Sequence, residues 1–130
     1  MIANKTMKIG AMGEEIVANS LSDKGYEIVS RNYRKKCGEL DIVAKKSGTL
    51  HFVEVKSFQS AFAEKKGSYD GMRPEDNFTS HKHKKMNKVI QLFLEDKHLM
   101  GITWQIDLAS VVLNTETRLA RVEMLRNVVL

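Results

Sequence analysis

Apolar residues recur at helical spacing in two segments of the chain, residues 8–24 and residues 80–98. In the second segment they fall at positions i, i+3, i+4, i+7 and i+8, which are Met86, Val89, Ile90, Phe93 and Leu94. In the first segment a wide apolar arc is followed by Gly25, at the place where a glycine commonly ends a helix. This periodicity predicts two amphipathic helices, each with one face directed at a core.

Shorter runs between and after these segments alternate apolar and polar residues, as strands do. These runs cover residues 26–33, 38–58, 102–113 and 119–125. The second run contains the turn signal Lys46-Ser47-Gly48 and therefore predicts a β-hairpin. The order of helix, three strands, helix and two strands predicts an α/β (α+β) fold with a mixed central sheet flanked by helices. With 130 residues, the chain is expected to form a single domain.

The predicted hairpin brings acidic residues from its two strands together. Side chains alternate along a strand, so one face of the first strand should carry Leu40, Ile42 and Ala44. A loop of residues 46–49 sets a register with three pairs of interest, which are Lys45 with Leu50, Asp41 with Glu54, and Glu39 with Lys56. Directly opposed side chains lie about 4.5–5.5 Å apart at Cβ. The register therefore predicts that the carboxylates of Asp41 and Glu54 face each other.

Two opposed carboxylates repel each other unless a positive charge lies between them. A divalent cation such as Mg²⁺ binds carboxylate oxygens and waters, and usually needs only one or two protein carboxylates. Lys56 would then lie beside the metal, where its ammonium can hold a water or a phosphate oxygen. This combination predicts a site that cuts phosphodiester bonds. The alternative is a structural ion network in which Lys56 pairs with Glu39 and Glu54.

Asp41, a short hairpin and Glu54-Val55-Lys56 form the pattern Asp…(Asp/Glu)-x-Lys. Five pieces occur in order along the chain: Met12-Gly13-Glu14-Glu15, Gly25-Tyr26, Arg31-Asn32-Tyr33-Arg34, Gly38-Glu39-Leu40-Asp41 and Phe52-Val53-Glu54-Val55-Lys56. Through them the chain resembles the YraN-like uncharacterised family of the PD-(D/E)xK nuclease superfamily, a group similar to Holliday-junction resolvases. The resemblance continues more weakly through residues 82–94 and Ile106-Asp107, so it covers most of the chain.

The resemblance implies a restriction-endonuclease-like αβββαβ core with one added C-terminal strand, in a single endonuclease-like domain. It implies catalytic roles for Asp41, Glu54, Lys56 and Glu14. Asp41 and Glu54 would bind Mg²⁺ or Mn²⁺, with Glu14 as a third ligand and the backbone carbonyl of Val55 as a further one. Lys56 is expected to position the attacking water, because a lysine between carboxylates holds its proton firmly. From periodicity alone, Glu14 borders the buried arc, and a charged edge residue that turns toward solvent is favoured; the resemblance reverses this preference.

The activity implied is metal-dependent hydrolysis of phosphodiester bonds in DNA, including branched or flapped DNA. The alternative is a nucleic-acid-binding module of the same fold without significant turnover. Resolvases act as symmetric dimers, so the resemblance also raises a homodimer, although no residues mark a dimer face.

The chain carries a net charge of +5, which favours an anionic partner or serves solubility alone. Basic residues cluster just before the hairpin and at the start of the second predicted helix. The expected contacts to nucleic acid, taken to be DNA, are Arg31, Arg34, Lys35, Lys36, Lys82, Lys84 and Lys85. Helical spacing directs Lys82 toward the sheet, and Lys84 and Lys88 toward solvent.

Other features exclude several classes of protein. The single cysteine, Cys37, excludes an internal disulfide framework and is expected to be inert. No run of the chain resembles a signal peptide or a membrane span, so a cytoplasmic protein without a membrane partner is expected. His81 and His83 diverge on a helix, which argues against zinc. Asp107 matches an aspartate of the family pattern, and we expect a structural role for it.

Residues 59–79 show no regular pattern and contain the only proline, Pro74. A long loop of this kind is either functional or a simple connection, so a flap over the substrate and an unstructured link are both consistent with it. The resembled family has a shorter connection here, around a Phe-Gly turn.

Overall fold

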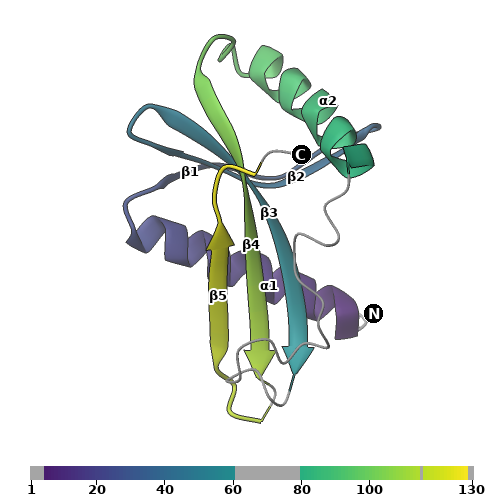
Figure 1. Ribbon diagram of the computed structural model, residues 1–130, viewed down its shortest axis with the longest axis vertical. Coiled ribbons are helices and arrows are strands. Elements are labelled where there is room, and N and C mark those ends of the chain that lie inside the picture. The colour runs from purple at the N-terminus through teal and green to yellow at the C-terminus, as the bar shows by residue number, and fades with distance from the viewer. Residues whose placement is uncertain (1–4, 61–79, 115, 129–130) are drawn as a thin grey trace.

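The computed structural model describes residues 5–60, 80–114 and 116–128. Two helices and five strands follow one another in the predicted order (Figure 1). Their bounds are α1 (Lys5–Asp23), β1 (Glu27–Lys35), β2 (Gly38–Lys46), β3 (Thr49–Ser60), α2 (Ser80–Asp96), β4 (Thr103–Asn114) and β5 (Ala120–Leu125). The predicted loop at residues 59–79 begins later than expected, because β3 continues through Ser60. The rest of that prediction, residues 61–79, lies outside the described residues.

The five strands form one mixed sheet in the order β1-β2-β3-β4-β5. β3 and β4 run parallel over the whole length of β3, and the other neighbours are antiparallel. Parallel neighbours require a crossover connection, and α2 lies within the segment that makes it. The predicted α/β (α+β) fold with a mixed sheet is therefore confirmed.

The two helices cover opposite faces of the sheet. Alternate residues of β3 and β4 belong to two separate cores, since Phe52 packs with α2 whereas Val53 packs with α1. The end of α1 follows the predicted pattern, because Gly25 has a φ of 91° and its N–H donates to the carbonyl of Ser22.

The register predicted for the hairpin is confirmed over most of its length. Lys45 pairs with Leu50, and the turn is shorter than expected because Lys46 pairs with Thr49. Ser47 and Gly48 both have positive φ angles, 51° and 78°, as a two-residue type I′ turn requires.

The hairpin ladder ends at Ile42 and Val53, and beyond them β2 separates from β3. The predicted backbone pair of Glu39 with Lys56 is therefore wrong, because Glu39 pairs with Arg34 of β1. The common face predicted for Leu40, Ile42 and Ala44 is also wrong. Leu40 packs on the α2 side, whereas Ile42 and Ala44 pack on the α1 side. In Figure 1 the β1–β2 pair turns across the direction of β3 and β4. Alternate residues of β2 therefore do not all pack on the same side of the sheet.

Phe93 lies at the centre of the α2 core. It is fully buried, and its ring meets those of Tyr33 and Phe52 edge to face, with centroid distances of 5.1 and 5.8 Å. Phe93→Ala is expected to lower the free energy of unfolding by about 3–5 kcal/mol, because the cavity cannot fully collapse. Urea denaturation measures this loss. Leu92→Ala on the exposed side of the same helix serves as the control and should change the value by less than about 0.5 kcal/mol.

Candidate metal and nucleic-acid site

The site forms at the point where β2 leaves β3. The backbone N–H of Val55 donates a hydrogen bond of 2.9 Å to Oδ2 of Asp41. A side chain of β2 thus provides the acceptor for β3 just beyond the last ladder pair. Asp41 is only 6% exposed and is fixed by this bond. The branch point therefore holds a buried carboxylate beside Glu54 and Lys56.

Asp41 and Glu54 are brought together as predicted, through their side chains rather than as a ladder pair. Burial raises the pKa of Asp41, and hydrogen bonds from the Val55 N–H and with the Glu54 side chain partly offset the rise. Nζ of Lys56 lies 3.7 Å from Oε1 of Glu54. Asp41 and Glu54 thus lie within hydrogen-bond reach of each other, and a cation could bind between their carboxyl groups.

Glu14 approaches the pair from α1. Burial raises its pKa first, and the charges of Asp41 and Glu39 raise it further. The helix packs closely here, because a Cβ added at Gly13 would meet the side chain of Ser57 on β3. The glycine of the Met12-Gly13-Glu14-Glu15 motif therefore lets α1 bring Glu14 to the edge of the site.

The donor set fits Mg²⁺ or Mn²⁺ through two side chains rather than three. Within the described ranges, no three histidine, cysteine, aspartate or glutamate side chains lie close enough together to hold a metal ion. Asp41 and Glu54 supply oxygen ligands, and Mg²⁺ commonly binds one or two protein carboxylates and keeps several waters. Glu14 lies near enough to feel the charge of Asp41 and would act on a bound ion through water.

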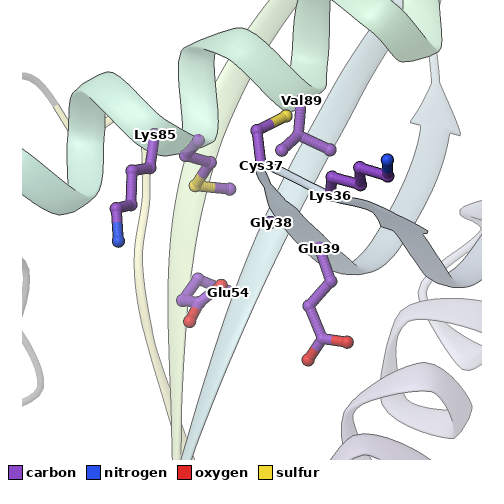
Figure 2. A pocket seen from close by; sticks show the side chains of 8 residues that line it. Lys36, Cys37, Gly38, Glu39, Glu54, Lys85 and Val89 are labelled. Carbon is purple, nitrogen blue, oxygen red and sulfur yellow. The ribbon is translucent and has the colours of Figure 1, made fainter.

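Two of the predicted basic residues line the same cavity as Glu54. Lys36 and Lys85 line a cavity of about 320 Å³, together with Cys37, Gly38, Glu39, Glu54, Met86 and Val89 (Figure 2). The turn between β1 and β2 supplies one wall and the N-terminal half of α2 supplies another. No pattern along the chain indicates this cavity, because it depends on how that turn meets α2.

A second cavity, of about 240 Å³, opens on the α1 side of β3. Glu14, Val55, Lys56 and Ser57 are among its lining residues. Glu54 lines the cavity beside α2, while Lys56 and Glu14 line the one beside α1. The candidate site is therefore accessible from both faces of β3, which strand alternation alone did not predict.

The other predicted basic contacts divide into two groups. Three of them form ion pairs on the surface, Arg31 with Glu15 at 2.8 Å, Arg34 with Glu39 at 2.7 Å, and Lys35 with Asp96 at 3.5 Å. Their charges are thus partly compensated within the protein. Lys84 is exposed on α2, as predicted, and so is Lys88. The predictions for Lys82, His81 and His83 concern side chains outside the described residues.

Asp107 lies away from this site, in a separate buried network. It is fully buried on β4, and its carboxylate accepts hydrogen bonds from the Gln105 side chain and from the backbone N–H of Asn127, each of 2.8 Å. Nδ1 of His51 lies 2.8 Å from its other oxygen. These contacts attach the C-terminal segment to the sheet, in keeping with the structural role expected for Asp107.

Asp107→Ala is expected to lower the free energy of unfolding by about 1–3 kcal/mol, because it leaves buried donors without an acceptor. Thermal unfolding measures the loss. DNA binding by the folded variant should match that of the wild-type protein. A variant of normal stability with impaired binding would contradict this assignment.

The fold and the carboxylate pair together define a small α/β domain with an acidic site at a sheet branch point. Residues 13–112 match the sequence model of the uncharacterised protein family UPF0102, and the chain belongs to this family. The match includes Glu14, Asp41, Glu54 and Lys56. Within the described part of the chain, no helix is both long and apolar enough to cross a membrane.

Several relatives carry the same family name. The UPF0102 protein of Caldicellulosiruptor saccharolyticus is 31% identical over 120 residues, which cover 92% of this chain and 95% of that protein. The UPF0102 protein of Campylobacter lari is 38% identical over 102 residues, covering 78% of this chain and 81% of the relative. The UPF0102 protein of Alkaliphilus metalliredigens is 33% identical over 111 residues, which cover 85% of this chain and 90% of that protein. The similarity thus spans most of each protein.

Proposed function

We propose that this protein is a metal-dependent nuclease that hydrolyses phosphodiester bonds in DNA, branched or flapped DNA included. One observation carries the proposal, the pairing of the buried Asp41 carboxyl with the half-buried Glu54, with the Lys56 ammonium 3.7 Å from Glu54. The resemblance of these residues to the YraN-like group of the PD-(D/E)xK superfamily supports the same conclusion. A cytoplasmic location and a homodimer belong to the same proposal.

The chemistry assigns a role to each side chain. Mg²⁺ or Mn²⁺, when bound, supplies an acidified water and positive charge beside the phosphate. Asp41 and Glu54 would hold the ion, with the Val55 carbonyl as a further ligand and Glu14 acting through water. Lys56 orients the attacking water, with its Nζ held 3.7 Å from Oε1 of Glu54. The water oxygen bonds to phosphorus, and the bond from phosphorus to the leaving sugar oxygen breaks.

DNA as the substrate is supported by Lys36 and Lys85, which line the same cavity as Glu54, and by the net charge of +5. Lysines that contact backbone phosphates release counterions, so binding weakens as salt rises. Both lysines are exposed and thus accessible to a nucleic acid.

A second candidate function is a nucleic-acid-binding module without significant turnover. It is favoured by the absence of a ready three-residue metal group among the residues that the structure describes. This alternative predicts DNA binding that persists in EDTA, with no cleavage. The remaining alternative, a purely structural ion network, predicts no change of melting temperature with Mg²⁺ or Mn²⁺.

The test is cleavage of end-labelled duplex, single-stranded, flap and four-way-junction DNA, each with Mg²⁺, with Mn²⁺ and with EDTA. We expect cutting that requires metal and that differs among the four shapes. Binding without cutting under every condition would replace the nuclease with the binding module. Melting temperatures with and without metal are measured in parallel. A metal-dependent change would argue against the purely structural ion network.

Lys85→Ala is expected to weaken DNA binding and to reduce the slope of log K against log salt by about 1, since one phosphate contact is lost. Fluorescence anisotropy between low and physiological salt measures the slope. Lys97→Ala is the matched control, because Lys97 is an exposed lysine beyond the other end of α2. An equal effect of both substitutions would show that only the overall charge matters.

A further inference from the structure

The cavity between α2 and the β1–β2 turn has two chemically different walls (Figure 2). One wall is apolar and rich in sulfur, formed by Cys37, Met86 and Val89, of which Val89 is fully buried. The opposite side carries the carboxylates of Glu39 and Glu54. In Figure 2 Lys85 extends from α2 on the side of Glu54, whereas the ammonium of Lys36 points away from both carboxylates. The cavity is therefore apolar on one side and acidic on the other.

The volume and the chemistry of these walls restrict the ligand. About 320 Å³ lies at the lower end of the range of about 300–1,000 Å³ found for small-molecule pockets. A lone phosphate is disfavoured, because two carboxylates share its space. A flat neutral ring suits the cavity better, since sulfur atoms contact aromatic rings favourably. Carboxylate oxygens can accept hydrogen bonds from the N–H groups on the edge of a base.

From these observations, and resting on the proposed nuclease function, we propose that the cavity binds one unstacked nucleobase of the DNA strand that is cut. Glu54 lines the cavity and also belongs to the carboxyl pair, so a base held there lies next to the cleaved phosphate. Lys36 and Lys85 contact the phosphates that flank the base. The substrate class is then DNA with an unpaired nucleotide beside the scissile bond.

This placement determines which DNA is cut fastest. A base must leave the helical stack to enter the cavity, and the cost is smallest for a base that is already unpaired. Matched duplex should therefore be cut at least about tenfold more slowly than the same duplex with one unpaired nucleotide, since only the former must break a base pair.

The experiment compares two labelled duplexes of the same sequence, one of which carries a single unpaired 2-aminopurine. Cleavage is measured with Mn²⁺, and binding is followed in EDTA through the 2-aminopurine emission. Cys37→Phe fills the cavity from the turn, and Cys37→Ser is the matched control at the same position. As a second way of filling the cavity, the folded wild-type protein is treated with N-ethylmaleimide. Cys37 is the only cysteine of the chain, so Cys37→Ser is the unreactive control.

We expect wild type and Cys37→Ser to prefer the unpaired substrate and to change the 2-aminopurine emission on binding. For Cys37→Phe and for the modified protein, the cleavage rates of the two duplexes should differ by less than about twofold. Their binding should leave the 2-aminopurine emission unchanged. Equal cleavage of both duplexes by the wild-type protein overturns this inference and leaves the nuclease proposal intact. No cleavage at all rejects the nuclease proposal, and the emission arm then decides alone whether a base enters the cavity. Competition by inorganic phosphate but not by a nucleoside would assign the cavity to phosphate instead.

Discussion

Asp41→Asn is expected to abolish metal-dependent cleavage while raising the melting temperature at neutral pH. The amide oxygen can still accept the hydrogen bond from the Val55 N–H, so the branch point keeps its shape. The substitution removes the negative charge that would bind the cation. Cleavage should fall to the level seen in EDTA, and Mg²⁺ should no longer raise the melting temperature.

The stability gain follows from the raised pKa of Asp41, which has burial as its main cause. The folded protein binds a proton at this carboxyl more tightly than the unfolded chain does. Ionisation therefore destabilises the fold, and this loss develops as the pH rises through the folded pKa. Below the ordinary value of 3.8 the carboxyl is protonated in both states, so variant and wild type should converge.

Thermal unfolding measured from about pH 4 to about pH 8 tests this dependence, with a difference of a few degrees expected at the upper end. Glu95→Gln is the matched control, because it neutralises an exposed carboxylate in the last turn of α2 that is not among the groups shifting the pKa of Asp41. A lower melting temperature for Asp41→Asn at neutral pH would show that the ionised carboxylate stabilises the site.

Lys56→Met is expected to reduce cleavage by about 10²–10⁴-fold, the range typical of a group that acts in proton transfer or positions the nucleophile. Methionine keeps the apolar stem and removes the ammonium near Glu54. The effect of Mg²⁺ on the melting temperature should persist, because the carboxyl pair is unchanged. Single-turnover cleavage and thermal unfolding with metal are the two measurements.

Lys45→Met provides the control for this substitution, since Lys45 is an exposed strand lysine at the far end of the same hairpin. Loss of both cleavage and metal response in Lys56→Met would assign a structural role to Lys56 instead. Full activity in Lys56→Met would reject its part in the mechanism.

Local patterns predicted the parts of this protein that depend on neighbouring residues. The apolar stripe on α2 follows from helical periodicity, and the Ser47-Gly48 turn set the hairpin register correctly as far as Ile42 and Val53. The common face of Leu40 and Ile42 was predicted wrongly, because β2 separates from β3 at this point while it stays paired with β1. That departure depends on a hydrogen bond from β3 to a side chain of β2, which no periodicity reveals.

The candidate site was predicted only in part, for a similar reason. The meeting of Asp41 with Glu54 follows from hairpin register and from the resemblance. The cavity beside Glu54 required knowledge of how α2 packs on the β1–β2 turn, which is a long-range contact. The ion pair of Arg31 with Glu15 likewise joins β1 to α1, and the spacing of these two residues along the chain does not predict it.

Because β2 separates from β3 at the site, the meeting of the two carboxyl groups depends on complete folding of the domain. Glu54 belongs to a strand paired along its whole length with β4, whereas Asp41 follows Leu40 on a strand whose residues Leu40 and Val43 pack on the α2 side. If the β1–β2 pair lost its contact with α2, most of the secondary structure could remain while the two carboxyl groups parted. Under the proposed function, partly folded chains would then have lost affinity for the ion, and cleavage would be confined to the native state.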